Sequence, residues 1–280
     1  MGETQEGGTM NEYEIIALFC HLDDFCKAHK LHDSRREMTD SEVLLTALIA
    51  ARAFRGNLSL ACKFLKENKY CPHMLSKSRF NRRIHQFPEW LWLEVMKTFC
   101  FERNVQEHIV DSFPIQTCRM ARRYRSNLFV GDQYLGYNAA HKQWYVGLKV
   151  HLISTAKGNP LSFIISPGSE HDLTALKIME IPLGRESILY GDKAYTDYEW
   201  EEELKAERDI ELIAQRKSNS KRRHPEKVEK RRAKVRKFIE TAISGIIRLM
   251  PRWIQAVTAK GFELKLVLFV VGFASLQLAT

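Results

Sequence analysis

The sequence predicts an α/β protein in which an all-α N-terminal region precedes a mixed five-stranded sheet with flanking helices. Up to about residue 100, apolar residues recur at helical spacing. From about residue 106, short apolar runs bounded by turn residues alternate with helical segments. The chain has 280 residues, of which 45% are hydrophobic, so a sizeable core is expected. We therefore expect two domains, residues 1–100 and 101–280.

The N-terminal region is expected to be a series of short helices. Thr39 and Glu42 have the spacing of a capping box, in which each side chain bonds the other residue's backbone amide at the start of a helix. Breaks at Gly56 and Pro88 separate later apolar segments. Helices are predicted over residues 12–29, 43–54, 59–67, 76–87 and 90–101.

The second region is expected to form the sheet. Strands are predicted over 107–115, 144–154, 161–166, 186–191 and 209–215, and helices over 170–180, 198–208 and onward from about Val228. Short connections make the first three strands antiparallel, and helical crossovers make the later ones parallel. The order β-β-β-α-β-α-β-α is that of the ribonuclease-H-like fold.

Composition narrows the class of protein. The net charge of +9 suits a polyanionic partner, although many ordinary proteins share it. The six cysteines form no paired C-x-x-C sets, so we expect reduced thiols in a cytoplasmic protein. The apolar run 264–279 is shorter than the roughly 20 residues that a membrane span needs, so we expect a buried terminal helix and no membrane.

Three carboxylates fall at related places of this topology. Asp111 interrupts the first strand, Asp192 follows the fourth in YGDKAY, and Glu240 lies on the last helix among apolar residues. Ligands gather at the carboxyl ends of neighbouring parallel strands. Converging carboxylates repel unless a cation binds, and their oxygens favour Mg²⁺ or Mn²⁺. Two such ions about 3.5–4 Å apart can drive phosphodiester chemistry.

Each of these residues also has a structural interpretation that stays open. Asp111 is equally suited to a strand end, Asp192 to an Asx turn and Glu240 to a solvated helix face. The functional interpretation rests on all three falling at the expected places of one fold.

Two basic segments are candidates for DNA binding. Segment 216–237 would displace counterions from phosphates, or be a solvated loop. The helix at 76–87 suits a helix-turn-helix-like reader of base edges, or a basic helix facing solvent. The residues expected to contact DNA are Arg79, Asn81, Arg82, Arg83, Lys193, Arg222, Arg223, Arg231, Arg232 and Arg236.

At these residues the chain resembles DDE-type transposases of bacterial insertion sequences, closest to the group numbered nine-eight-two. The resemblance spans most of residues 38–280 and rests on IVDSFPI, GxxHD at Gly168–Asp172, YGDKAY and R-x-x-x-E at Arg236–Glu240. It implies that Asp111, Asp192 and Glu240 hold two Mg²⁺ ions, with Mn²⁺ as a substitute. It also implies that water cleaves the element's ends and that the freed 3′-hydroxyl attacks target DNA.

The chain departs from a longer signature of some relatives, because Ala233 and Ile247 stand where Tyr and Lys would be. Arg236 is expected to clamp a phosphate from one turn before Glu240, or to be a surface arginine. Asp172 is expected to cap its helix, with a supporting role at the site as the alternative.

The expected partners are double-stranded DNA, both the terminal inverted repeats and the target, and a second copy of the chain, since two ends must be held together. The expected location is the bacterial cytoplasm, at the nucleoid. Two rival functions stay open: a metal-dependent nuclease of the same fold that cuts without strand transfer, and an inactive descendant that only binds DNA.

Overall fold

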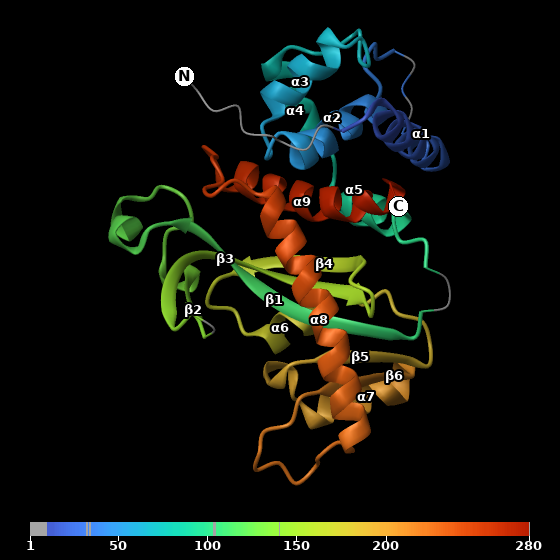
Figure 1. Ribbon diagram of the computed structural model, residues 1–280. Coiled ribbons are helices and arrows are strands. Elements are labelled where there is room, and N and C mark those ends of the chain that lie inside the picture. The colour runs from blue at the N-terminus through green and yellow to red at the C-terminus, as the bar shows by residue number, and fades with distance from the viewer. Residues whose placement is uncertain (1–9, 32, 34, 103–104, 140, 280) are drawn as a thin grey trace. The chain divides into compact units, whose positions relative to one another are not determined.

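The computed structural model describes residues 10–31, 33, 35–102, 105–139 and 141–279 (Figure 1). The chain divides into two compact units. The first comprises the described residues of Met1–Phe101, Gly245–Ala256 and Lys260–Thr280, and the second comprises those of Glu102–Ser244 and Val257–Ala259. The sequence predicts one domain for all of 101–280.

The first unit is helical. Its elements are α1 (Glu12–Ala28), α2 (Asp40–Ala53), α3 (Leu58–Glu67), α4 (Lys77–Ile84), α5 (Glu89–Thr98), α9 (Ala259–Ala274) and the 3₁₀ turn η4 (Ser275–Ala279). The predicted capping box is present, because Thr39 Oγ1 accepts the Glu42 amide and the Glu42 carboxylate accepts the Thr39 amide. Helix α9 joins this unit through close contacts of Gly272 with Ala51 and of Phe269 with Gly56.

Helix α9 is the most apolar helix of this unit. Ala259–Leu278 is long enough and, with a mean hydropathy of 1.6, apolar enough to span a membrane, and α2 with α3 passes the same test only as a pair bent by 113°. Half of the Ala259–Leu278 window is buried inside the structure, and core helices commonly pass this test. Leu266, Phe269 and Val270 are fully buried there. This burial favours a core helix.

The second unit is built on a mixed sheet of six strands within the described residues: β1 (Glu107–Cys118), β2 (Leu135–Asn138), β3 (Gln143–Thr155), β4 (Pro160–Pro167), β5 (Ser187–Gly191) and β6 (Ile210–Ala214). Strand β1 lies between β3, its antiparallel partner, and β5, its parallel partner. Strand β6 pairs with β5 in parallel, and both β2 and β4 pair with β3.

The expected number of five strands was therefore too low by one. The additional strand, β2, has four residues and pairs Leu135–Asn138 with the first residues of β3. It is short and contains Gly136, so the sequence carries no run of β-formers that would reveal it. The predicted hairpin of β3 and β4 and the parallel pairs of β5 are confirmed.

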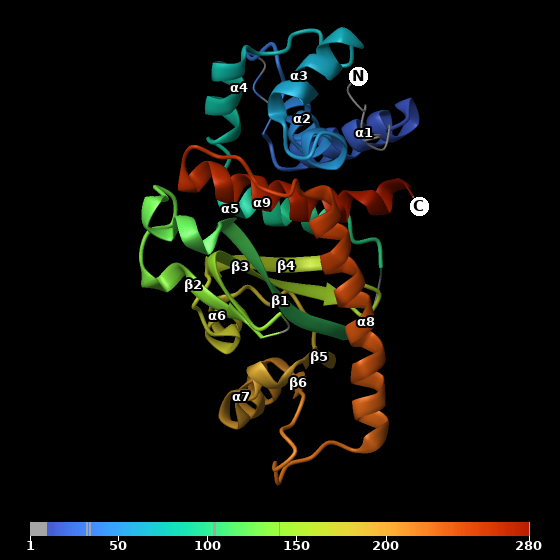
Figure 2. The same ribbon diagram turned by 60° about the vertical axis from the view of Figure 1, so that its left-hand side comes forward.

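Helices cover both faces of the sheet (Figure 2). Helices α6 (Asp172–Ile178) and α7 (Tyr198–Arg208) lie on one side, where Leu176 and Leu204 share a buried cluster with Val110 and Leu189 of the sheet. Helix α8 (Glu226–Leu249) crosses the other face along residues 226–244. Side chains alternate along a strand, so neighbours of Val110 on β1 point toward α8.

One glycine brings α8 close to the sheet. Gly158 lies in the turn between β3 and β4 with φ +93°, a conformation that side-chain-bearing residues rarely adopt. A Cβ at this position would lie 2.9 Å from the Phe238 carbonyl oxygen. The turn can therefore approach the backbone of α8 only because residue 158 has no side chain.

Candidate active site

The register of the sheet places Asp111 and Asp192 level with each other. Ile109 of β1 pairs with Tyr190 of the parallel strand β5. Asp111 and Asp192 each lie two residues further along, in the same direction. Neighbouring strands are about 4.8 Å apart. Side chains two residues apart on a strand share a face, so both carboxylates lie on the face of Ile109 and Tyr190, which is the face toward α8. The structure thus brings these two predicted residues to the same edge and the same face of the sheet.

Asp111 is a half-buried carboxylate in the centre of a paired strand. One carboxylate oxygen accepts the Ser112 amide over 2.8 Å. Burial raises the pKa of Asp111 to about 6, against the lowering effect of that amide and of Arg236, and Asp192 and Asp172 raise it further. The strand-end interpretation does not hold, because β1 continues to Cys118 and Asp111 pairs with Leu152 of β3.

Asp192 combines two roles. It is the N-cap of the 3₁₀ turn η3 (Lys193–Tyr195), and its Oδ1 accepts the Ala194 amide over 2.7 Å. This is the Asx-type turn considered from the sequence. The turn fixes one carboxylate oxygen and so orients the side chain at the end of β5. The structural and the functional interpretations of Asp192 are therefore compatible.

Glu240 lies on the solvent side of α8. Its side chain is 56% exposed, and its Oε1 accepts a hydrogen bond from Arg236 Nε over 3.0 Å. Arg236 Nη2 lies 4.0 Å from Asp111 Oδ2. Burial alone would lower the pKa of Arg236, but the carboxylates of Asp111 and Glu240 outweigh it and raise that pKa. Arg236 therefore links two of the predicted carboxylates.

The contacts of Arg236 with Asp111 and Glu240 determine which carboxylates are available to a metal ion. Among the residues that the structure describes, no three His, Cys, Asp or Glu side chains lie close enough to form a metal site. Asp111 and Asp192 alone offer the oxygen donors that Mg²⁺ prefers, and Mg²⁺ commonly takes one or two carboxylates with water and phosphate completing its shell. The pair therefore fits one ion, whereas the predicted set of three is not assembled while Glu240 bonds Arg236.

Asp172 was expected to cap its helix, but it does not. His171 is the N-cap of α6, and no side chain caps that helix. Instead Asp172 Oδ1 accepts hydrogen bonds from Ser112 Oγ over 2.9 Å and from Lys149 Nζ over 3.1 Å. The short polar contact with Ser112 turns the carboxylate toward β1, so it supports the strand that carries Asp111.

Two residues of this network were missed by the sequence analysis. Lys149 and His151 lie on β3, and His151 Nδ1 is 3.6 Å from Asp172. Burial lowers the pKa of His151 well below 6.5, so this ring is neutral at pH 7. The signal was present in the sequence, since a lysine and a histidine inside the otherwise apolar strand WYVGLKVHLIS need buried partners.

The basic segment 216–237 is held by acidic partners rather than being a free loop. Arg216 and Arg222 contact the Tyr198 ring, with 4.8 Å and 4.6 Å between each guanidinium carbon and the ring centre. The same two arginines pair with acids of α7, Glu201 and Glu202 respectively. Arg223 donates to the Ser218 carbonyl. The segment is therefore anchored on α7, and Arg222 and Arg223 remain exposed on it.

Three predicted arginines of α8 also have carboxylate partners. Arg231 pairs with Glu107 at the start of β1, and Glu107 also accepts the Tyr190 hydroxyl. Arg232 is buried and pairs with Glu229, which argues against direct DNA contact. The third is Arg236. Lys193, beside Asp192, is exposed.

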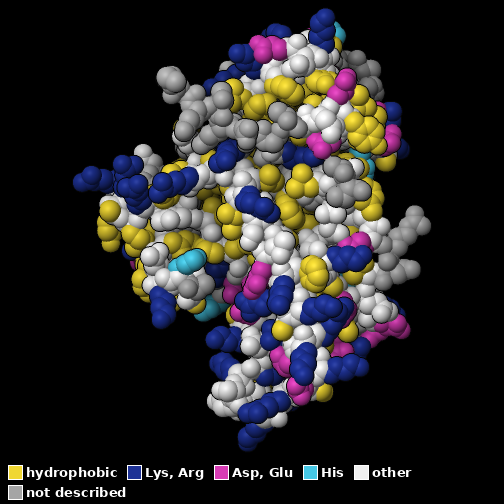
Figure 3. Space-filling view, in the orientation of Figure 1, with side chains coloured by type: hydrophobic (Ala, Val, Ile, Leu, Met, Phe, Trp, Pro, Cys, Tyr) yellow, Lys and Arg dark blue, Asp and Glu magenta, His cyan; other side chains and the backbone are white. Residues whose placement is uncertain are grey.

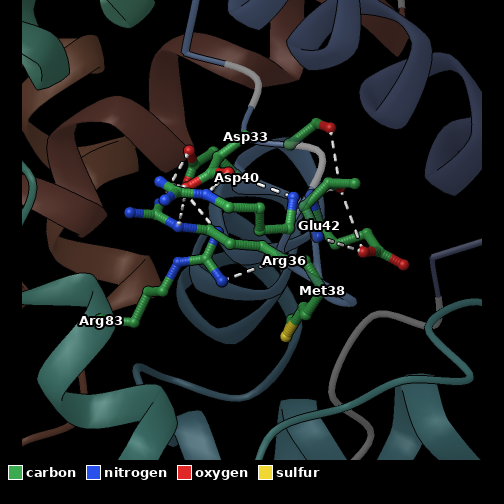
Figure 4. Close-up of polar contacts among 9 residues, drawn as sticks. Asp33, Arg36, Met38, Asp40, Glu42 and Arg83 are labelled. Carbon is green, nitrogen blue, oxygen red and sulfur yellow. Dashed lines mark hydrogen bonds and ion pairs between the residues drawn. The ribbon is translucent and has the colours of Figure 1, made fainter.

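The four residues of α4 that were predicted to contact DNA differ in exposure. Arg79 and Arg82 are exposed, and Asn81 is half-buried. Arg83 instead points into the unit, where Nη1 donates to the Met38 carbonyl over 2.7 Å and Nη2 to Asp40 over 2.6 Å (Figure 4). Its side chain is 11% exposed. Arg83 therefore fixes α4 to the start of α2 and is not available to a ligand.

Comparison with known protein families gives a match for the second unit. The family model described as a transposase DDE domain matches residues 103–251, more than half of the chain. No curated protein and no solved structure matches. The matched range contains Asp111, Asp192 and Glu240. An enzyme domain of the nuclease or transferase kind follows from the match. The chain belongs to the family of proteins with a transposase DDE domain.

Proposed function

We propose that this protein is a DNA transposase that cleaves the ends of an insertion sequence and joins the freed 3′-hydroxyl to target DNA. The observation that carries the proposal is the position of Asp111 and Asp192, level on one face of the sheet in a transposase DDE domain. The strand order supports a ribonuclease-H-like fold for residues of the second unit. The motifs around the three acids favour a bacterial element of the group numbered nine-eight-two.

We propose that Asp111 and Asp192 hold a divalent cation, Mg²⁺ or Mn²⁺, and that Glu240 completes a site for two. Bound there, such cations would activate a water or hydroxyl and stabilise the leaving oxygen of a phosphodiester. Asp111 must be ionised to act as a ligand, so its raised pKa means that a proton leaves when the cation binds. The Asx turn presents the second oxygen of Asp192 in a fixed direction.

Arg236 has two successive roles in this proposal. Without DNA it neutralises Asp111 and Glu240. Its planar guanidinium fork is also suited to a phosphate of the DNA, which it would bind if a cation took its place beside these carboxylates. To join the two aspartates, Glu240 would have to turn away from Arg236, its hydrogen-bond partner on the exposed side of α8.

The proposed partner is double-stranded DNA. Arg79, Asn81 and Arg82 on α4 are candidates to read the terminal repeats, and Lys193, Arg222 and Arg223 are candidates to bind phosphates near the acids. Such contacts release counterions, so affinity should fall steeply with salt. We propose a homodimer for the synapsis of two ends, residues 1–100 as the end-binding region, and the bacterial nucleoid as the location.

Two other functions use the same residues. A nuclease would cut without joining, and an inactive descendant would bind DNA without cutting. A helical N-terminal unit with exposed basic residues on α4 favours the transposase, because a plain nuclease has no need to recognise specific ends. The presence of both aspartates at one level argues against a descendant that has lost its chemistry.

The test is a cleavage and joining assay on the element's terminal DNA with Mg²⁺. Wild type is compared with Asp192→Asn, which keeps the size and the turn but removes the charge, and with Asp24→Asn on the exposed side of α1 as the matched control. Joined product from wild type and the control but not from Asp192→Asn supports the proposal. Cutting without joining indicates the nuclease. Equal products from all three would refute the site.

A further inference from the structure

An exposed group of aromatic and arginine side chains lies away from the acids, at the far end of β1. We call it the ring-arginine surface and define it by Arg119, Arg122, Tyr124, Arg125, Tyr137 and Trp144. Tyr124 is 90% exposed, Trp144 57% and Tyr137 50%. Large rings at such exposure cost solvation free energy, so a cluster of them indicates a binding surface. None of these residues takes part in the site described above.

The register of the sheet pairs two of the rings and places the segment with the arginines at the end of the neighbouring strand. Tyr137 of β2 and Trp144 of β3 are directly paired, and their ring centres are 5.2 Å apart. Cys118, the last residue of β1, pairs with Val146, and the 3₁₀ helix η1 (Met120–Arg125) begins two residues later, beside the start of β3. Figure 1 shows this segment in green at the left, and Figure 3 shows Lys and Arg side chains gathered at the same place.

The framework beneath the surface is packed, so the exposure of the rings is not a consequence of a loose loop. Phe129 is buried, and its ring lies edge-on to Tyr134 with 5.2 Å between centres. Arg123 pairs with Asp132, and Ser169 Oγ donates to the Gln133 carbonyl over 2.7 Å. The segment thus has its own apolar and polar contacts, and the three exposed rings are additional to them.

The charge of this surface has one sign. Arg119, Arg122 and Arg125 are exposed on η1 or beside it. Asp132 is the only acidic residue in the sequence from 119 to 144, and its carboxylate is engaged by Arg123. The surface therefore presents cations and flat apolar rings. A ligand complementary to this surface must therefore carry negative charges for the arginines and flat faces for the rings, alternating along its length.

We propose that the ring-arginine surface binds unpaired bases of single-stranded DNA. The rings would stack on bases and the arginines would contact phosphates, a combination typical of proteins that bind single strands. The inference rests on the proposed function in taking DNA as the substrate, and it adds which part of the DNA is bound. Duplex DNA fits less well, because its bases are already stacked and leave the rings without partners.

The position of the surface suits a strand that leaves the acidic site. Eight residues of chain separate Asp111 from Arg119 along β1, and at about 3.3 Å a residue the separation is about 26 Å. One strand of a duplex has a phosphate about every 3.4 Å along the axis, and an unpaired strand can extend further, so about eight nucleotides or fewer cover that length. An unpaired strand released at a cleaved end can therefore reach the rings.

The test measures binding of a fluorescein-labelled 12-nucleotide oligothymidine by anisotropy, with EDTA present so that metal chemistry plays no part. The variants are Trp144→Ala and Tyr124→Ala, with Trp144→Phe as the conservative replacement. Trp90→Ala, which removes an equally exposed Trp on α5, is the matched control. We expect each alanine variant to weaken binding about tenfold, as stacking on one base implies. Trp144→Phe and Trp90→Ala should stay within about threefold of wild type, since a ring is kept or lies elsewhere.

A 12-base-pair duplex provides the second arm. Trp144→Ala should leave duplex affinity unchanged, whereas Arg122→Gln with Arg125→Gln should weaken both ligands. For the single strand, that double variant should lower the slope of log affinity against log salt by about 0.7 for each phosphate that is no longer neutralised. The inference is overturned if Trp144→Ala binds the single strand as wild type does, or if single strand and duplex lose affinity alike. Competition by anionic phospholipid vesicles that depends on Trp144 would also overturn it, in favour of a membrane surface.

The two proposals can fail separately. Asp192→Asn should bind the oligothymidine with wild-type affinity, because the rings are remote from the acids. Ring-dependent binding together with an absence of cleavage would count against the proposed transposase alone. Cleavage and joining by a protein whose ring variants bind normally would count against the ring-arginine surface alone. Unchanged thermal unfolding of each variant excludes misfolding as the cause of weakened binding.

Discussion

Arg236 Nη2 lies 4.0 Å from Asp111 Oδ2, so a cationic side chain already stands beside the acid expected to bind a metal ion. The same guanidinium holds Glu240 through its Nε. In the proposed function, metal ions and Arg236 would therefore compete for the same two carboxylates.

Arg236→Gln should increase the affinity of the DNA-free protein for Mn²⁺. The substitution removes a positive charge next to Asp111 and frees Glu240. We expect a gain of about threefold to tenfold, less than an unscreened charge would give, because Arg236 is more than one third exposed. Isothermal titration calorimetry with Mn²⁺ measures it, and Arg222→Gln on the segment beside α7 is the control. A gain no larger than that of Arg222→Gln would contradict the competition.

Asp111→Asn should stabilise the metal-free protein at pH 7 but not at pH 4. Burial raises the folded-state pKa of Asp111 from 3.8 to about 6, so the folded state binds the proton more tightly than the unfolded state. Stability is then full below pH 4 and is lost as pH rises through 6. The variant lacks this loss and should gain about 1–3 kcal/mol at pH 7. Urea unfolding in EDTA at both pH values measures it.

The matched control for this pH dependence is Asp24→Asn, which makes the same chemical change at an exposed position of α1. It should change stability little at either pH. A stability difference between Asp111→Asn and wild type that is the same at pH 4 and pH 7 would show that ionisation of Asp111 is not its cause.

Arg83→Ala should destabilise the protein, whereas Arg79→Ala and Arg82→Ala should weaken DNA binding at unchanged stability. Removing Arg83 leaves the buried Asp40 with Arg36 as its remaining partner and leaves the Met38 carbonyl without this donor. We expect a loss of about 2–4 kcal/mol in the free energy of unfolding. Thermal unfolding and a gel-shift assay with terminal DNA separate the two effects. A stable Arg83→Ala that no longer binds DNA would restore the sequence-based assignment of Arg83.

Tyr198→Leu should release the basic segment from α7. Both Arg216 and Arg222 contact this ring, and each such contact is worth about 0.5–1 kcal/mol at an exposed site. Limited trypsin digestion should cut faster at Lys217 and Lys221 in this variant. Tyr198→Phe keeps the ring and removes only the hydroxyl that bonds Ser220, so its digestion rate should stay near that of wild type. Equal rates for Leu and Phe would show that the ring does not anchor the segment.

Local patterns account for what the sequence predicted correctly. The alternation of residues 144–154, the capping box at Thr39 and the short connection at Gly158 each depend on neighbours along the chain, and each is confirmed. The acids Asp111 and Asp192 could be placed at one edge because a helical crossover predicts parallel strands, whose carboxyl ends meet there. These features need no knowledge of distant contacts.

What the sequence could not predict depends on partners far along the chain. In the sequence, Arg83 and Arg231 cannot be distinguished from other basic helix residues. Their partners, Asp40 and Glu107, lie far away along the chain. Asp172 has the sequence position of a cap, but the hydroxyl of Ser112, 60 residues away, draws its carboxylate to the sheet. The packing of α9 with the N-terminal helices is likewise a long-range contact that periodicity does not encode.

Strand β1 is paired on both sides near Asp111, whereas Glu240 is exposed on α8 and Arg236 is half-buried between the two acids. The site therefore joins groups that move on very different timescales. Strands within a sheet open only on the slow scale of local unfolding, while side chains exposed to water change rotamer within about nanoseconds. The hydrogen bond between Arg236 and Glu240 therefore lies on the fast side of the site, whereas the position of Asp111 is held by the slow one.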